Sequence, residues 1–153
     1  FMATNHTTNY ELNQWLSADQ VLRTDFNADN AKIDAALAET AAAVPRIAVG
    51  TYTGSGASAR TILVGFTPKA VILCSEEGIT YDGYASGYTT LRGGLILPNC
   101  PLRLEYGSVG STSYQTAAQI TTNGFTVCQV QLTNNHNVEC NASGVRYHYL
   151  AIG

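Results

Sequence analysis

The sequence has few charges of either sign and very little lysine. Of its 153 residues, eight are lysine or arginine, eleven are aspartate or glutamate, and only Lys32 and Lys69 are lysines. A net charge near -3 leaves no basic patch or stripe of the kind that binds nucleic acid or an anionic membrane surface. The composition therefore argues against both classes of partner.

Long apolar runs are also missing. No run approaches the roughly 20 apolar residues that a membrane-spanning helix needs, and the chain opens without the basic, apolar and small-residue pattern of a signal peptide. We therefore expect a soluble cytoplasmic product without membrane insertion. The length and an apolar fraction of 45% suit one folded domain with an appendage.

The sequence lacks cysteine and histidine spacings that indicate a metal site or a disulfide framework. Cys74, Cys100, Cys128 and Cys140 form no Cys-x-x-Cys pair and have no metal-ligand spacing with the three histidines. Cys74 and Cys128 lie inside apolar strand runs, where a free cysteine is commonly a small buried hydrophobe. We predict free thiols, with a disulfide as the alternative, and neither a metal nor a cofactor.

The most informative pattern present lies between Ser17 and Pro45. Its large apolar residues are spaced seven and four apart, which places one narrow stripe along a helix, because eleven residues make about three turns. Ser17 fits the N-cap of this helix, and Pro45 ends it. Such a stripe is best buried against copies of itself, and a helix packed across its own domain is the alternative. The stripe starts near Trp15 and contains Leu22, Phe26, Ile33, Leu37 and Val44, with Asn30 as a polar residue close to the seam.

After the helix the texture changes to short apolar or alternating runs separated by Gly, Pro, Asn and Ser, which is typical of an antiparallel β-sandwich. The predicted fold class is mainly β, with an N-terminal helix that forms a parallel coiled-coil stalk. We predict an irregular segment over residues 1–16, the stalk over 17–45 and the β-sandwich over 46–153. Strands are predicted at 47–53, 60–65, 69–75, 93–97, 101–106, 117–121, 125–132 and 145–152.

The segment from Glu76 to Gly94 has the composition of a binding loop. Tyrosine supplies rigid amphipathic contact area, and glycine and serine let a loop adapt to its ligand. Tyrosine faces with polar groups at the margin suit a sugar ring, and the alternative is that the tyrosines fill gaps at a subunit interface. A second segment, Tyr106 to Gln115, has the same composition and is expected to lie beside the first. The candidate ligand-binding residues are Tyr81, Asp82, Tyr84, Tyr88, Arg92, Tyr106 and Tyr114.

Catalytic patterns are weak. A glycosidase needs two carboxylates a few ångströms apart, whereas the adjacent Glu76 and Glu77 at a strand end would point to opposite faces. No Gly-x-Ser-x-Gly motif supports a serine nucleophile. We therefore do not expect an enzyme.

Several motifs resemble one family of proteins. The run Tyr10 to Trp15, followed by Asp25-Phe26-Asn27 and Ile33-Asp34, resembles the N-terminal motif of tail-fibre proteins of tailed bacteriophages and prophages. The run from Gly65 to Val71 and the closing run from Tyr147 to Gly153 resemble the β-rich tip domain of such fibres. Together these motifs cover most of the chain.

The resemblance implies a receptor-binding function. It suggests a homotrimer on a virion or phage-derived particle, in which a three-helix stalk presents lectin-like tips to a bacterial surface glycan or another receptor. Other phage tail proteins would be further partners. The alternative is a purely structural tail-fibre or baseplate component that binds no ligand.

Overall fold

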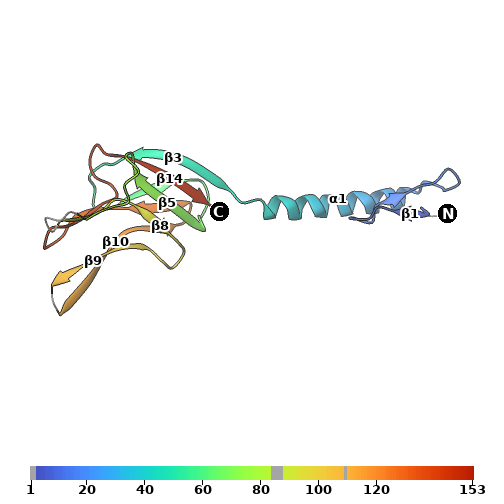
Figure 1. Cartoon of the computed structure of the whole chain (residues 1–153). Helices are drawn as coiled ribbons and strands as arrows, with labels where there is room; N and C mark the ends of the chain where they lie inside the picture. Colours follow the sequence, from blue (N-terminus) through green and yellow to red (C-terminus); the bar gives the residue numbers. More distant parts are fainter. Residues whose placement is uncertain (1–2, 84–87, 109) are drawn as a thin grey trace. The chain divides into compact units, whose positions relative to one another are not determined.

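The chain folds as two compact units in the computed structural model, which describes residues 3–83, 88–108 and 110–153. The N-terminal unit, Phe1–Pro45, holds the helix, and the β unit, Arg46–Gly153, holds the large sheets (Figure 1). Within the described residues, no helix combines the length and the apolar character needed to cross a membrane.

The N-terminal unit consists of two short strands and one helix. Strands β1 (Asn5–His6) and β2 (Asn13–Gln14) pair antiparallel, and helix α1 spans Arg23–Ala43. Asp29 ties the strands to the helix, because its carboxylate accepts hydrogen bonds from the backbone N–H of Asn13 at 3.0 Å and from Asn13 Nδ2 at 2.9 Å. This short antiparallel pair is the regular structure within the described part of the segment predicted as irregular.

Helix α1 begins later than the sequence pattern predicts. Its first residue is Arg23 rather than Ser17, because the Asp19 carboxylate accepts hydrogen bonds from the Thr4 hydroxyl at 2.7 Å and the Leu16 backbone N–H at 2.8 Å. These bonds form a turn ahead of the helix. The bond from the Thr4 side chain, followed by that from Leu16, holds the pKa of Asp19 below its usual value.

The apolar stripe of α1 is uncovered in the single chain. Phe26, Ile33, Leu37 and Val44 are 55%, 42%, 64% and 61% exposed, and Asn30 is exposed among them. The described part of the chain contains one helix, so the structure does not show a coiled coil. The structure does show that the apolar stripe stays largely exposed within its own unit.

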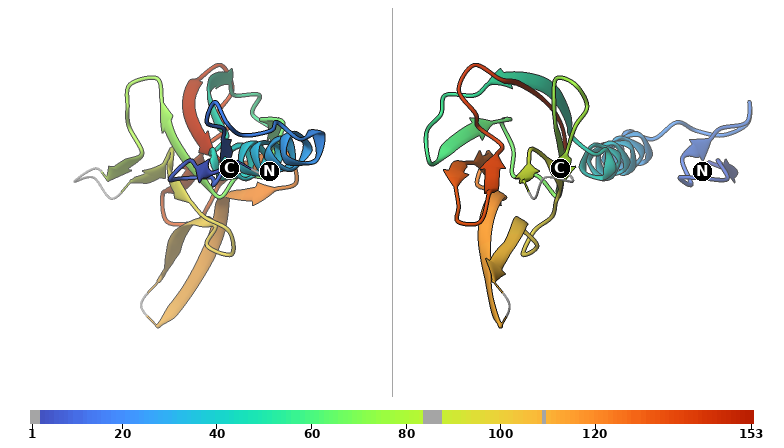
Figure 2. Two further views of the ribbon diagram at one scale, coloured as in Figure 1. Left: turned by 90° about the vertical axis from the view of Figure 1, so that its right-hand side faces the viewer. Right: turned by 60° about the vertical axis from the view of Figure 1, so that its left-hand side comes forward.

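The described part of the β unit forms three four-stranded sheets. Their strand orders are β3-β14-β5-β8, β4-β11-β10-β9 and β12-β13-β7-β6 (Figures 1 and 2). All neighbours pair antiparallel except β7 and β13, which are parallel. A mainly β fold of antiparallel sheets is thus confirmed, with three sheets where a simple sandwich has two. The strands are β3 (Ile47–Thr53), β4 (Arg60–Leu63), β5 (Ala70–Ser75), β6 (Tyr81–Gly83), β7 (Thr89–Leu91), β8 (Gly94–Ile96), β9 (Leu102–Ser108), β10 (Ser111–Thr121), β11 (Gly124–Val127), β12 (Gln129–Gln131), β13 (His136–Glu139) and β14 (Arg146–Ile152).

The three sheets share one hydrophobic core. The rings of Tyr52 and Tyr147 stack with centroids 5.0 Å apart, and Phe125 meets Tyr149 edge to face at 5.3 Å. These aromatic pairs join strands that are far apart in the sequence, and aliphatic side chains fill the space around them. The fully buried aliphatic residues include Val71, Leu73, Ile96, Val127 and Val138.

Buried hydroxyls and thiols complete this core. The Tyr147 hydroxyl accepts a hydrogen bond from the backbone N–H of Ala142 at 3.1 Å and donates one to the carbonyl of Glu139. Burial raises the pKa of Tyr147 to about 12, and burial also raises the pKa of the Cys128 and Cys140 thiols. All four cysteines are free thiols. Among the described residues, no group of three His, Cys, Asp or Glu side chains gathers closely enough to hold a metal ion.

Two truncations distinguish the shared core from the surface. Phe125 on β11 is fully buried, whereas Leu63 on the neighbouring strand β4 is 71% exposed. We expect Phe125→Ala to lower the free energy of unfolding of the β unit by about 3–5 kcal/mol, because it leaves a cavity. Leu63→Ala should change it by less than about 0.5 kcal/mol. Urea unfolding followed by circular dichroism measures both, and equal losses would contradict a core centred on Phe125.

Candidate ligand-binding face

The segment predicted as a binding loop, Glu76 to Gly94, forms a β-hairpin. Strands β6 and β7 pair antiparallel, and Asp82 lies opposite Thr90. Residues 84–87 between these strands, which include Tyr84, lie outside the described residues. Because β7 pairs with β13 and β13 with β12, the hairpin is half of a four-stranded sheet rather than an isolated loop.

Alternation along the strands gives this sheet one apolar and one polar side. Leu91 and Val138 are aligned in register and buried in the core. The residues that alternate with them point to the opposite side, where strand register and side-chain contacts place them in two adjoining rows. We name this surface the polar face; one row is Asp82, Thr90, Asn137 and Gln131, and the other is Arg92, Glu139 and Gln129. Thr90 is buried beneath its neighbours, at 8% exposed.

The polar face carries a shallow depression of about 200 Å³ over β12 and β13. It is lined by Gln129, Val130, Gln131, Asn137, Val138 and Glu139, four of which carry polar side chains. Of these four, Gln131 is exposed and the other three are half-buried. The Gln129 Oε1 atom is itself buried without a hydrogen-bond partner, so Gln131, Asn137 and Glu139 are the residues whose polar groups are offered to a ligand. Each amide offers hydrogen-bond donors and an acceptor at one point, which suits a ligand with adjacent hydroxyl groups.

Charged side chains gather at one end of the polar face. Arg92 Nε lies 3.3 Å from Glu139 Oε2, and Arg92 Nη1 lies 4.0 Å from Glu77 Oε2. Beside this group, Arg146 Nη1 lies 3.3 Å from Glu76 Oε1, and the neighbouring depression has a volume of about 250 Å³. Five of the eleven charged residues of the β unit thus lie together. Because carboxylates flank each arginine, the cluster suits an uncharged ligand better than a polyanion.

The tyrosines of the β6–β7 hairpin lie at different positions relative to the polar face. Tyr88 immediately precedes β7 and is exposed. Tyr81 is also exposed, but alternation puts it on the side opposite Asp82, and its ring lies against Gly83. Of the predicted ligand-binding residues, Asp82 and Arg92 are therefore the two that the structure brings onto the polar face.

The second predicted binding segment is a hairpin of a different sheet. Tyr106 on β9 pairs with Ser113 on β10, and Tyr114 pairs with Glu105. Adjacent pairs in a sheet point to opposite sides, so the two tyrosines do not share a surface. Both views in Figure 2 show this hairpin extending from the rest of the β unit. The expectation that Tyr106 and Tyr114 contribute to one site is therefore corrected.

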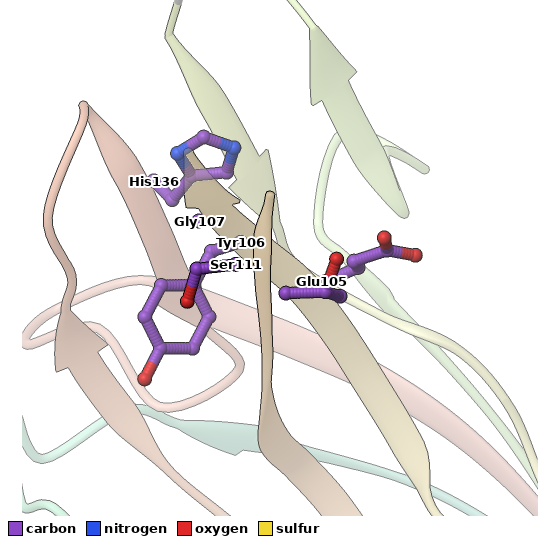
Figure 3. Close-up of a pocket in the computed structure, with 6 residues that line it drawn as sticks. Glu105, Tyr106, Gly107, Ser111 and His136 are labelled. Carbon is purple, nitrogen blue, oxygen red and sulfur yellow. The ribbon is translucent and has the colours of Figure 1, made fainter. Parts of the chain in front are cut away.

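A further depression, of about 320 Å³, lies where the β9–β10 hairpin meets the start of β13. Tyr106 and His136 both line it, but in Figure 3 the Tyr106 ring and the Glu105 carboxylate extend away from each other. Asn134 connects its walls, because its Nδ2 donates to the Gly107 carbonyl at 3.2 Å and its own carbonyl lies 2.8 Å from His136 Nδ1. The polar face brings together more amide and charged side chains than this depression, so it is the stronger candidate.

Sequence reasoning missed most of the polar face. Its central residues lie in the short patterns Gln129-Val-Gln131 and Asn137-Val-Glu139, which alternate between polar and apolar residues. The first pattern was included in a longer apolar run, and the second was assigned to no strand. A strict search for alternation over three residues would have found both, but it cannot show that the two patterns pair with each other.

A stability comparison tests whether Arg92 serves the fold or the surface. The Arg92 and Glu139 side chains are both partly exposed, so solvent weakens their ion pair. We expect Arg92→Ala to change the free energy of unfolding by less than about 1 kcal/mol. Leu91→Ala, on the buried side of the same strand, should lower it by about 2–5 kcal/mol. Urea unfolding checks both, and similar losses would assign Arg92 a structural role.

Comparison with known proteins adds no identification to this geometry. No protein-family model matches the chain, and neither the curated proteins nor the solved structures contain a significant match. The resemblance to tail fibres therefore stays a prediction from the sequence motifs.

Proposed function

We propose that this chain is a bacteriophage tail-fibre adhesin, which binds a bacterial surface glycan through the polar face and assembles as a homotrimer through α1. The observation that supports binding most directly is the alignment of amide, carboxylate and guanidinium side chains on the polar side of one sheet. The particle that carries such a fibre would be a virion or a phage-derived assembly.

The polar face has the chemistry that a neutral sugar requires. Asn137 and Gln131 can each donate and accept hydrogen bonds with neighbouring hydroxyls, and Glu139 accepts from hydroxyl donors. The exposed ring of Tyr88, next to β7, offers an apolar surface for the face of a sugar ring. Arg92 can contribute donors at the margin while Glu77 and Glu139 compensate its charge.

The same arrangement favours binding over hydrolysis. A general acid catalyst must hold a proton at neutral pH, which usually requires a carboxyl in an apolar and unpaired setting. Glu77 and Glu139 instead lie on either side of the Arg92 guanidinium. Carboxylate oxygens in this setting can accept hydrogen bonds from sugar hydroxyls.

The assembly follows from the poor core of the N-terminal unit. Among its described residues, only Asp25 and Asp29 are fully buried; Leu12, Trp15 and Leu22 are partly buried, and no large apolar side chain is fully removed from water within one chain. A helix of 21 residues gains most of its stability from packing of its apolar side. The uncovered stripe of α1 provides that packing surface, and the tail-fibre resemblance suggests three parallel copies.

Three copies would strengthen attachment without new contacts at each site. Once one polar face holds a repeating surface polymer, the other two bind in effectively intramolecular steps. Weak binding at each face would then give firm attachment of the whole fibre. The alternative proposal is a structural fibre component, which the stripe would support equally well but which leaves the polar face without a role.

Ligand binding is tested by variants on two different sheets. We expect Asn137→Ala and Gln131→Ala each to weaken glycan binding about tenfold, because each removes a hydrogen-bonding group worth about 1.4 kcal/mol. Tyr114→Ala, on the β9–β10 hairpin, should leave affinity within about twofold. A glycan array of host envelope polysaccharides finds the ligand, and calorimetry measures the variants. If the wild-type chain binds no envelope glycan, the structural alternative is favoured. If only Tyr114→Ala loses affinity, the ligand binds at the β9–β10 hairpin and not at the polar face.

Assembly through α1 is tested by two matched double variants. Phe26→Asp with Leu37→Asp places charges in the stripe, and we expect the mass in solution to fall from three times the 16.3 kDa chain to that of a monomer. Ala28→Asp with Ala35→Asp places the same charges on the exposed opposite side of the helix and should leave a trimer. Sedimentation equilibrium measures both. A wild-type monomer would contradict the stalk.

A further inference from the structure

The outer side of the sheet β3-β14-β5-β8 carries a second uncovered apolar surface. Register aligns Val49, Leu150, Ile72 and Leu95 in one row across all four strands. Val49, Ile72 and Leu95 are 77%, 49% and 54% exposed. A neighbouring row adds more aliphatic residues. We name the whole surface the apolar face; its residues are Ile47, Val49, Ala70, Ile72, Leu95, Leu150 and Ile152.

This pattern is that of a sheet covered on both sides. The residues that alternate with the apolar face, such as Val71, Leu73 and Tyr147, are fully buried in the core. An antiparallel sheet with one solvated side normally shows polar residues on that side. The apolar face carries no charged side chain, and Thr51, paired with His148 on β14, marks where its polar border begins. Copies of this surface can therefore meet without electrostatic repulsion.

The position of the apolar face in the chain indicates its occupant. The stripe of α1 ends at Val44, and the apolar face begins at Ile47. Three residues of chain span at most about 11 Å. If parallel helices bring several Val44 residues together, the starts of the β3 strands must also lie near one another. The face is richest in aliphatic residues at this end of β3, where Ile47 pairs with Ile152.

We propose that the apolar faces of three copies pack against one another around a common axis, so that the β units form a joint core. This inference rests on the proposed assembly through α1 but adds a separate surface to it. The polar face belongs to a different sheet and shares no residue with the apolar face. Assembly and ligand binding therefore use different side chains.

The test compares one substitution at two exposed leucines of the full chain. Leu95 lies on the apolar face, and Leu63, at 71% exposed, lies on β4 of another sheet. We expect Leu95→Asp to raise the concentration at which the trimer dissociates at least tenfold, and Leu63→Asp to change it less than twofold. Leu95→Ala, which removes apolar area without adding charge, should give a smaller rise in the same direction. Sedimentation equilibrium over a dilution series measures all three, with circular dichroism to verify that each β unit is folded.

The outcomes separate this inference from the proposed stalk. If the wild-type chain is trimeric and the stripe variant dissociates it, but Leu95→Asp and Leu95→Ala behave like Leu63→Asp, the apolar face does not join the copies. If the wild-type chain is monomeric at every concentration, both the stalk and the joint core are wrong. If Leu95→Asp unfolds the β unit, an unchanged dissociation of the folded Leu95→Ala variant overturns the inference.

Discussion

Burial of one side of each sheet in a single shared core is the constraint on which the other properties of the β unit depend. Side chains alternate along a strand, so every residue that packs near Tyr147 or Phe125 forces its neighbours to point away from the core. The outer sides of the sheets are therefore set by the same alternation that fills the core. In one sheet the outer side is polar and carries Asn137 and Glu139; in another it is aliphatic and carries Val49 and Ile72. Two surfaces of opposite chemistry thus follow from one packing arrangement.

The N-terminal unit, in contrast, buries few apolar side chains. Its helix is tied to the preceding strands by polar contacts, chiefly from Asp29 to Asn13, and its apolar side chains stay in water. Burial of a large apolar side chain contributes about 1.5–3 kcal/mol, which each exposed residue of the stripe does not gain within the single unit. Association with other copies would therefore bury apolar side chains that the single unit leaves exposed. Together with the apolar face of the β unit, the stripe gives one chain two exposed apolar surfaces, which is consistent with the proposed multivalent adhesin.

Local patterns were sufficient for the elements whose signal lies within a few residues. The strands β3, β5 and β14 were predicted nearly to the residue, because each is a continuous apolar or alternating run bounded by turn residues. The predicted helix start was too early, because Asp19 accepts a hydrogen bond from Thr4, fifteen residues away in the sequence. The spacing of apolar residues cannot reveal such a bond. Strands β6, β7 and β13 were missed, because they are short and polar and are held by pairing with each other. Asp82 and Arg92 could be predicted as candidates, because they lie in one Tyr- and Gly-rich segment. Gln131 and Asn137 could not, because only strand pairing brings them beside that segment.

The sequence by itself determined an apolar stripe along one helix, a mainly β remainder, and a surface with little charge. These are properties of composition and of short-range spacing, which do not depend on how distant segments meet. Only the tertiary structure decided that Tyr106 and Tyr114 point to opposite sides of a hairpin, that Gln131 and Asn137 stand in one row with Asp82, and that an aliphatic row crosses four strands. Register and strand order make those choices, and both are set by packing between residues far apart in the chain.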